Sequence, residues 1–169
     1  LLNATGRMDR PSLGVALCMG DRSSALEQAN VTLEEYRRTI TRYLNWLTEE
    51  PGRIQELNSI YVARGGDFID EKVIPAISSI LSNSLPKPLV AFSTIPEEAA
   101  VKVSARAPNL PPGKEVNIGE VLRVAAEKFS GRGGGHDVAA GAQVPIELVE
   151  PFLKLVDELV KKQIETGAI

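Results

Sequence analysis

The sequence predicts an α/β protein in which N-terminal connector helices, one of them long, precede a small mixed-sheet domain with flanking helices. Two observations lead to this prediction. A single apolar stripe with helical spacing runs through the first third of the chain, and after Pro51-Gly52 short apolar strands alternate with amphipathic helices. We therefore predict a first part over residues 1–52 and a second over residues 53–169.

The composition limits the classes of function. Of 169 residues, 43% are hydrophobic and 24% charged, as in ordinary globular proteins, and the net charge of −3 means that any anion site must be local. A single cysteine, Cys18, and a single histidine, His136, exclude a disulfide framework and a zinc cluster of such residues within the chain. No apolar run reaches the ~20 residues of a membrane span and no signal segment opens the chain, so we expect a cytoplasmic protein without membrane contact.

The first part is predicted to be helical. Pro11 suits the first turn of a short helix that runs to about Met19, and Ser24 with Glu27 forms a capping box for a long helix over about residues 22–49. We interpret this helix as a structural strut, with a partner-binding helix as the alternative. Because the chain opens on apolar residues and not on methionine, we expect it to be part of a longer protein. The stripe of the long helix comprises Leu26, Ala29, Leu33, Tyr36, Ile40, Tyr43 and Leu47.

The second part combines strands and helices. Asp70 is predicted to cap a helix to about Ser82, and Asn117 with Glu120 to cap another that ends at Gly131 as a C-cap glycine. A last helix follows, with Phe152 and Val156 on its apolar face. The predicted strands are 59–63, 89–93, 101–105 and 138–144, with a turn at 64–67, a short return strand at 68–69 and a proline-rich loop at 108–116.

The stretch SGRGGGHDVAAGAQVP, residues 130 to 145, is predicted to be a glycine-rich loop that leads into the strand 138–144. Glycines let a ligand approach bare amides, and successive amides form an anion-binding nest. We therefore predict a phosphate or carboxylate site made by these N–H groups and His136. A flexible hinge or tight turn is the alternative.

The strand VKVSARA gives a second indication of anion binding. Because side chains alternate between faces, Val101, Val103 and Ala105 face the core, whereas Lys102, Ser104 and Arg106 face outward. Arginine binds phosphate oxygens in a fork, and a serine hydroxyl adds a neutral hydrogen bond. The alternative is an amphipathic edge strand with a solvated outer face. One helix separates this strand from the glycine loop and could bring the two together.

Standard catalytic and nucleotide motifs do not fit. The dinucleotide pattern G-x-G-x-x-G would need glycine where His136 stands, and Gly113-Lys114 lacks the spacing of a P-loop. A hydrolytic arrangement of Ser104, His136 and Asp137 has no feature that would order the three side chains.

The combination of VKVSARA with GRGGGHDVAAGAQVP resembles the C-terminal, DHH-associated substrate-binding domain of DHH-family phosphoesterases, and more narrowly that of archaeal RecJ-like single-strand exonucleases. That domain has a Ser-x-Arg strand and a Gly-Gly-His loop leading into Ala-Ala-Gly. The opening NATGRMDRPSLGVALCMGD is similar to the segment where the RecJ family leaves its catalytic domain, written N-A-x-G-R. The resemblance covers the whole chain, with the long helix as connector.

The resemblance implies a two-metal phosphodiester hydrolysis with Mn²⁺ or Mg²⁺, whose ligands belong to a preceding catalytic domain with an Asp-His-His triplet. Since the triplet is absent from this sequence, we expect no bound cofactor and no nuclease activity of this chain alone. By the motifs, Ser104 and Arg106 would bind one backbone phosphate, and the Gly133–Gly135 segment with His136 another or the one cleaved.

Further residues are added from the opening motif and from local position. Arg7, in the N-A-x-G-R match, would reach toward the catalytic cleft, and local position adds Lys102 and Arg132. Asp137 replaces the proline that commonly follows the histidine, and we expect it to face away from the phosphate or to orient the His136 ring. The phosphate-binding set is therefore Arg7, Lys102, Ser104, Arg106, Arg132, Gly133, Gly134, Gly135 and His136.

The leading prediction of function is a single-stranded DNA- or RNA-binding module of an exonuclease that acts with its own catalytic domain. One alternative keeps the enzyme class but takes a short oligonucleotide or cyclic dinucleotide as substrate. Another is a non-catalytic scaffold at the replication fork, with replisome partners such as a GINS complex.

Overall fold

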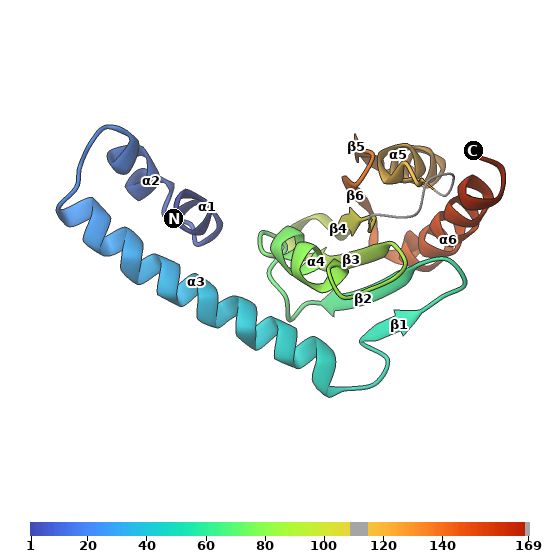
Figure 1. The fold of residues 1–169 in the computed structure, drawn as a ribbon, viewed down its shortest axis with the longest axis horizontal. Coiled ribbons are helices and arrows are strands. Elements are labelled where there is room, and N and C mark those ends of the chain that lie inside the picture. The colour runs from blue at the N-terminus through green and yellow to red at the C-terminus, as the bar shows by residue number, and fades with distance from the viewer. Residues whose placement is uncertain (109–114, 168–169) are drawn as a thin grey trace. The chain divides into compact units, whose positions relative to one another are not determined.

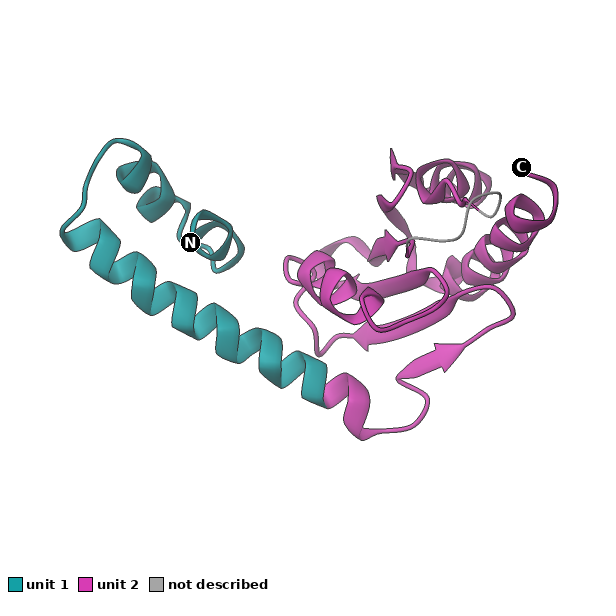
Figure 2. Ribbon diagram, in the orientation of Figure 1, with its two compact units in different colours: residues 1–45 teal, residues 46–169 magenta. Residues whose placement is uncertain are grey.

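The computed structural model describes residues 1–108 and 115–167 (Figure 1). The chain forms two compact units, residues 1–45 and 46–169, which Figure 2 shows in different colours. The division lies within the predicted long helix. Most of the predicted proline-rich loop, residues 109–114, lies outside the described residues.

The first unit contains helices α1 (Leu2–Arg7) and α2 (Pro11–Cys18) and most of α3 (Ser24–Glu49). The short and the long predicted helices are confirmed as α2 and α3, whereas α1 was not predicted. Leu17, Ala25 and Ala29 form a small apolar cluster.

The predicted capping box at the start of α3 is wrong. Ser24 already lies within the helix, and its hydroxyl accepts from the side-chain amide of Gln28 at 3.0 Å. The backbone N–H of Glu27 donates to the carbonyl of Ser23, because the chain enters the helix one residue earlier than the motif requires.

The second unit is built on one six-stranded sheet in the order β1-β2-β3-β4-β6-β5. Strands β2 and β3 are parallel, and all other neighbours are antiparallel. The predicted mixed sheet with flanking helices is therefore confirmed. The strands are β1 (Ile54–Glu56), β2 (Tyr61–Gly66), β3 (Leu89–Ile95), β4 (Ala100–Arg106), β5 (Arg132–His136) and β6 (Ala139–Pro145).

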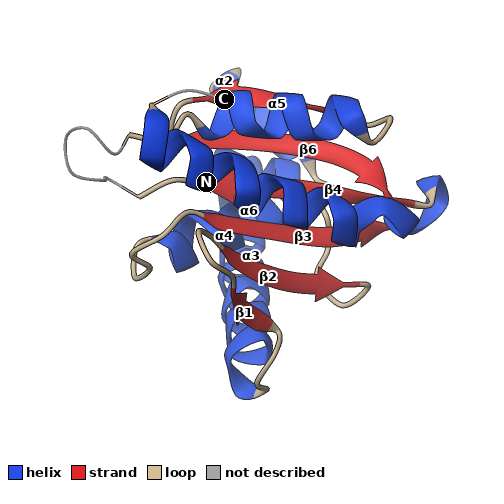
Figure 3. Cartoon of the chain, turned by 90° about the vertical axis from the view of Figure 1, so that its right-hand side faces the viewer, coloured by secondary structure: helices blue, strands red, loops and turns tan. Residues whose placement is uncertain are grey.

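Helices cover the sheet unequally. Helices α5 (Ile118–Lys128) and α6 (Val149–Thr166) lie on one face, and α4 (Ile74–Ser82) lies on the other (Figure 3). The main core lies between the sheet and the α5–α6 layer, where residues such as Val103, Leu122 and Phe152 are almost fully enclosed. Helix α4 covers only β3 and β4, so the same face of β6 and β5 stays exposed.

Three local predictions in this unit are wrong. Residues 64–66 continue β2 with a bulge and do not form a turn, because β2 pairs in parallel with β3 along its length. Phe68 and Ile69 form the turn after β2 and not a return strand, with the Phe68 N–H donating to Gly65. Strand β1 was missed because it is only three residues long.

The caps of α4 and α5 show one prediction confirmed and two corrected. The Asn117 side chain accepts from the Glu120 N–H at 2.9 Å, as predicted. Asp70 instead stabilises a turn before α4, which begins at Ile74. After α5, Ser130 and not Gly131 takes the left-handed conformation, whereas Gly131 is needed because a Cβ there would lie 2.4 Å from the Gln143 carbonyl.

Within the described residues, none of the helices has the length and apolar character required to cross a membrane.

Candidate functional site

The glycine-rich segment is a strand and not a loop. Residues Arg132–His136 form β5, which pairs antiparallel with β6 and lies at one edge of the sheet. Only Asp137 and Val138 remain as the turn between the two strands. The predicted loop is therefore wrong, because the bare backbone is used for strand pairing.

Helix α5 lies so close to β5 that it explains one glycine of the strand, Gly133, and one of the helix, Gly119. A Cβ on Gly133 would lie 2.6 Å from the Leu122 carbonyl of α5, and a Cβ on Gly119 of α5 would lie 2.8 Å from the Gly135 backbone. Real Cβ atoms do not approach other atoms so closely, so the helix and strand can touch only where both lack side chains. These glycines therefore have a packing role.

Gly134 differs from its neighbours. Its φ is 150°, a conformation that residues with an L side chain rarely adopt, yet a Cβ there would have no atom within 4 Å. Packing on α5 therefore does not require glycine at this position. The space above Gly134 is open on the face of the sheet opposite α5.

The strand register brings the predicted site residues onto one face. Paired residues of antiparallel strands point their side chains to the same side, and neighbouring strands lie ~4.8 Å apart. Three rows therefore cross β4, β6 and β5 on the α4 side of the sheet: Arg106–Ala139–His136, Ser104–Gly141–Gly134 and Lys102–Gln143–Arg132. We call this surface the polar face.

The central strand of the polar face has almost no side-chain bulk at two of its three positions. Ala139 and Gly141 lie between the flanking strands, and a Cβ on Gly141 would only make ordinary contact, 3.4 Å from the Val103 carbonyl. The backbones of Arg106 and His136 lie about 10 Å apart across this floor, as expected for two strand spacings. A ligand lying on Ala139 and Gly141 would have cationic or hydrogen-bonding groups on both sides.

Part of the β4 side of the polar face, at Ser104 and Arg106, is covered, which corrects the prediction that both side chains face outward into an open site. Helix α4 covers it, so Ser104 is 3% exposed and its hydroxyl lies 2.8 Å from that of Ser78. The Arg106 side chain is half-buried, and its Nε donates to the Ser79 hydroxyl at 2.9 Å. One of its terminal nitrogens donates to the Ala105 carbonyl at 2.8 Å and, more weakly, to Ser104 at 3.3 Å. Arg106 is thus held in place by α4.

A pocket of about 590 Å³ opens beside Arg106, between the end of α4 and the β5–β6 turn. Ser79, Ser82 and Asn83 supply polar groups from α4, and Val138 and Ala139 form the opposite wall. The guanidinium of Arg106 therefore stands between the serine hydroxyls of α4 and the open pocket, which suits a ligand anion.

The other cations of the polar face are exposed. The Lys102 ammonium is 3.9 Å from the Glu71 carboxylate, a loose pair, and about half of the Lys102 side chain is exposed. Arg132 is exposed on the edge strand. Gln143 between them donates to the Glu98 carboxylate. These acids moderate the positive charge at this end of the face.

The turn between β5 and β6 places His136 and Asp137 differently. His136 is exposed at the end of β5. The Asp137 carboxylate accepts from the Asn117 side chain at 2.9 Å, and its carbonyl accepts from the Ile118 N–H. Asp137 therefore joins the turn to the start of α5, in place of the predicted alternative in which it orients the His136 ring.

Arg7 belongs to the first unit, where it is half-buried at the end of α1. The structure thus brings together Lys102, Ser104, Arg106, Arg132, Gly134 and His136, whereas Gly133 and Gly135 lie between them with their α-carbons turned to the α5 side.

Sequence reasoning missed the residues that support the polar face. Ser78 and Ser79 were hidden in a predicted apolar helix, although two adjacent serines there were a usable signal. The alternation of Ala139, Gly141 and Gln143 with buried Ala140, Ala142 and Val144 was also present in the sequence. It was obscured because the segment is so rich in glycine and alanine.

The described residues do not fit the manganese or magnesium that the resemblance implies. Over residues 1–108 and 115–167, no group of three or more His, Cys, Asp and Glu side chains is arranged to hold a metal ion. The chemistry available on the polar face is hydrogen bonding and charge neutralisation.

The comparison with protein families agrees with this architecture. Residues 57–162 match the DHHA1 domain, and the chain therefore belongs to the DHHA1 family. It is 33% identical over 164 residues to the uncharacterized protein MJ0831 of Methanocaldococcus jannaschii. The match covers 97% of this chain and 34% of that protein, so the chain spans about a third of the length of this relative.

Solved structures share the fold at low sequence identity. The exonuclease RecJ bound to manganese aligns with a TM-score of 0.70 and 19% identity, over 95% of this chain and 39% of that one. The pGpG-specific phosphodiesterase PggH of Vibrio cholerae aligns with a TM-score of 0.53 and 14% identity, over 90% of this chain and 51% of that one. The chain thus has the fold found in these DHH-family proteins.

Proposed function

We propose that the chain is a module that binds the backbone of single-stranded nucleic acid within a DHH-family exonuclease, whose hydrolytic residues lie outside this chain. The observation that carries the proposal is the polar face. The two outer rows of this face end in Arg106, Lys102, Arg132 and His136, and Ala139 and Gly141 lie between the flanking strands with little side-chain bulk. The two rows that carry these side chains are about 13.6 Å apart along the strands, so they would contact phosphates about two nucleotides apart in an extended strand.

Arg106 is the principal phosphate ligand in this proposal. Its fixed position under α4 lowers the entropy lost on binding, because the side chain is already ordered before the ligand arrives. Ser104 supports it from below as a positioning residue, being enclosed by Ser78. Gly134 leaves the floor open for a backbone phosphate to approach the amides of β5.

A second candidate function is binding of a dinucleotide, favoured by the fold shared with PggH and by the pocket of about 590 Å³ beside Arg106. Strand length separates the two candidates. A module for long strands gains affinity as the oligonucleotide lengthens across the three rows, whereas a dinucleotide site does not.

The experiment that tests the leading proposal is a salt titration of oligonucleotide binding by three charge-removing variants, Lys102→Gln, Arg106→Gln and Arg132→Gln. Each should weaken binding of a single-stranded oligonucleotide and lower the slope of log affinity against log salt by about one, as expected for one lost phosphate contact. Lys154→Gln, on exposed α6 at the other side of the sheet, is the matched control. Equal losses in the control and the three variants would contradict the proposal.

A further inference from the structure

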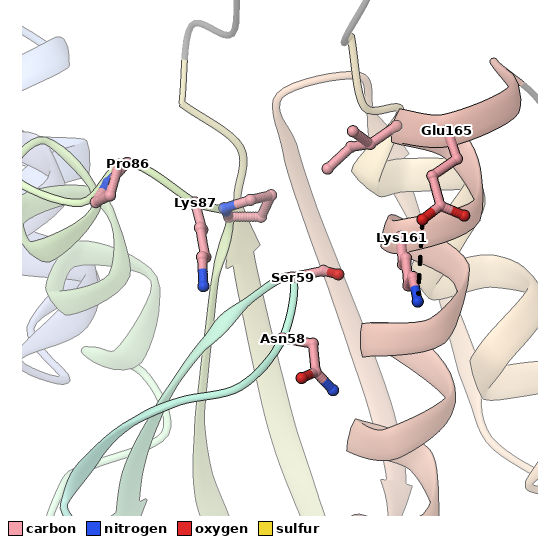
Figure 4. Close-up of a pocket in the computed structure, with 8 residues that line it drawn as sticks. Asn58, Ser59, Pro86, Lys87, Lys161 and Glu165 are labelled. Carbon is pink, nitrogen blue, oxygen red and sulfur yellow. Dashed lines mark ion pairs between the residues drawn. The ribbon is translucent and has the colours of Figure 1, made fainter.

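A second pocket, of about 320 Å³, lies away from the polar face, between the β1–β2 loop, the residues before β3 and the C-terminal half of α6 (Figure 4). Its walls include the rings of Pro86 and Pro88 and the side chain of Ile164, and Asn58, Ser59 and Lys161 supply its polar atoms. Pockets of this size and mostly apolar lining are typical of small-molecule sites.

The floor of this pocket is fixed by a buried carboxylate. Asp157 of α6 is 7% exposed and accepts from the backbone N–H of Ser59 at 2.7 Å and of Ile60 at 3.2 Å. The Asn58 side-chain amide donates to the same carboxylate at 3.2 Å. These bonds hold the β1–β2 loop against α6, so the pocket is pre-formed.

The Ser59 hydroxyl is the observation that points to a ligand. Ser59 is 8% exposed, and within the described part of the chain its hydroxyl makes no hydrogen bond, although its backbone N–H does. Figure 4 shows this hydroxyl directed across the pocket toward α6. Among the described residues the Ser93 hydroxyl, and not that of Ser59, is the fully enclosed one without a partner, so the Ser59 hydroxyl is accessible from the pocket and can bond to a ligand there.

The two lysines at the mouth of the pocket differ in how firmly they are paired. Lys87 is engaged by the Glu56 carboxylate at 2.6 Å and the Leu57 carbonyl at 3.2 Å. Lys161 is 61% exposed and lies 3.9 Å from the Glu165 carboxylate, too far for a strong hydrogen bond. Lys161 is therefore the ammonium that can turn toward an anion at the mouth.

We propose that this pocket binds a nucleotide, with the base between the proline rings and Ile164, its polar edge at the Ser59 hydroxyl, and its phosphate at Lys161. A planar base suits rigid apolar walls, and a hydroxyl can donate to or accept from its edge. The choice of ligand rests on the proposed function, but the site does not share residues with the polar face. The nucleotide is either a free mononucleotide or one nucleotide of a strand.

The test is an NMR titration of the 169-residue chain with deoxyadenosine 5′-monophosphate, deoxyribose 5-phosphate and a short oligodeoxyadenylate. The monophosphate should shift the amide signals of Asn58, Ser59 and Lys161, whereas deoxyribose phosphate, which lacks the base, should leave those of Asn58 and Ser59 in place. Shifts of these signals by the oligonucleotide would identify the strand as a source of the nucleotide, and shifts by the mononucleotide alone would identify a free ligand. Identical shifts with both phosphates, or none with the mononucleotide, would overturn the proposal.

Ser59→Ala is the decisive variant because it removes only an unpartnered hydroxyl. Loss of one hydrogen bond should weaken binding of the monophosphate about fivefold, while thermal stability stays the same or rises. The matched control is Ser93→Ala, which removes a hydroxyl without a partner that is fully enclosed in β3, away from the pocket, and should leave binding unchanged. Unchanged affinity in Ser59→Ala would reject the site.

Arg106→Gln separates this proposal from the proposed function. It should weaken binding of the oligonucleotide at the polar face and leave the monophosphate signals at Ser59 as in the wild type. If Arg106→Gln has no effect on the oligonucleotide, the proposed function fails while the pocket stands on its own titration.

Discussion

Strands β4 and β5 contribute to the same face of the sheet by opposite means. On β4 the side chains of Ser104 and Arg106 carry the chemistry, and α4 fixes them through Ser78 and Ser79. On β5 the three central residues are glycines: α5 lies so close to the opposite face of the strand that a Cβ on Gly133 would meet the Leu122 carbonyl, whereas Gly134 leaves the polar face open. A helix therefore orders each strand, but α4 fixes side chains on the polar face, whereas α5 excludes a side chain at Gly133 on the opposite face.

The comparison explains why a glycine run does not by itself indicate a flexible loop. Each glycine of β5 has its own cause, which is close packing at Gly133 and Gly135 and an unusual backbone conformation at Gly134 and Gly135. Only Gly134 faces open space on the polar face. Packing and binding should therefore separate when these positions are changed one at a time.

The largest loss of unfolding free energy is expected for Gly133→Ala. Its new methyl group would lie 2.6 Å from a backbone carbonyl and close to Ala126 and Ala142, none of which can move away alone. Overpacking of this kind costs about 3 kcal/mol of unfolding free energy. Chemical denaturation would measure it. Gly141→Ala, on the paired strand, is the control, with an expected change within about 0.5 kcal/mol since its methyl makes ordinary contact at 3.4 Å. Similar losses in both variants would refute the packing explanation.

Arg106→Ala should affect both binding and stability, by about 2 kcal/mol and about 1 kcal/mol respectively, because charge-assisted bonds to the ligand and bonds to α4 are lost together. The loss of stability is expected because Arg106 is bonded to Ser79 of α4 and to the Ala105 carbonyl, which its outward position on the strand did not reveal. Oligonucleotide titration and thermal melting measure the two effects.

Ser79→Ala is the companion of the Arg106 variant. It removes the hydroxyl that accepts from Nε but keeps the positive charge, so most of the affinity should remain. A loss of affinity in Ser79→Ala as large as in Arg106→Ala would mean that the position of the guanidinium, and not its charge, decides binding.

Gly134→Ala should lower stability by about 1 kcal/mol, since its φ of 150° disfavours an L side chain, and should also weaken oligonucleotide binding. Gly66→Ala on β2 is the matched control, because Gly66 also has a positive φ, 52°, and open space around a Cβ, but lies away from the polar face. Calorimetry with the oligonucleotide compares the two. If both variants bind as the wild type does, no ligand approaches the β5 backbone.

Much of the fold was predictable because local periodicity was strong. Several patterns predicted elements at the positions that the structure shows. They are the apolar stripes of α3 and α5, the cap at Asn117 and the alternation in β4. That the glycine-rich segment forms the strand β5 was not predictable, since a glycine run lacks the side-chain pattern that identifies a strand. Its pairing depends on contacts with α5 that only the tertiary structure supplies.

The candidate site was predictable in its chemistry but not in its surroundings. Lys102, Ser104 and Arg106 were assigned to one side of β4, and the register confirms that they share it. Alternation cannot reveal what covers that side, so the burial of Ser104 under α4 was missed. The pocket at Ser59 left no trace in the sequence because it joins three distant segments.

The smallest change in stability is expected where an arginine at the surface, in contrast to Arg106 beneath α4, loses its ion-pair partner. Arg64 of β2 pairs with Glu150, and this hydrogen bond lowers the pKa of the Glu150 carboxyl below its ordinary value of 4.5, with burial opposing the shift and the Arg64 charge adding to it. A carboxyl whose folded-state pKa is lowered contributes stability above its unfolded-state pKa, and that contribution is lost as the pH falls through the folded-state pKa. Because 63% of the Glu150 side chain is exposed, the pair contributes no more than about 0.5 kcal/mol of unfolding free energy.

Glu150→Gln should therefore melt at a slightly lower temperature than the wild type at neutral pH, and the difference should shrink as the pH falls below about 4.5 and when salt is added. Melting curves across this range measure it. A difference that persists in acid would show that the pair acts through packing of the Arg64 stem and not through charge.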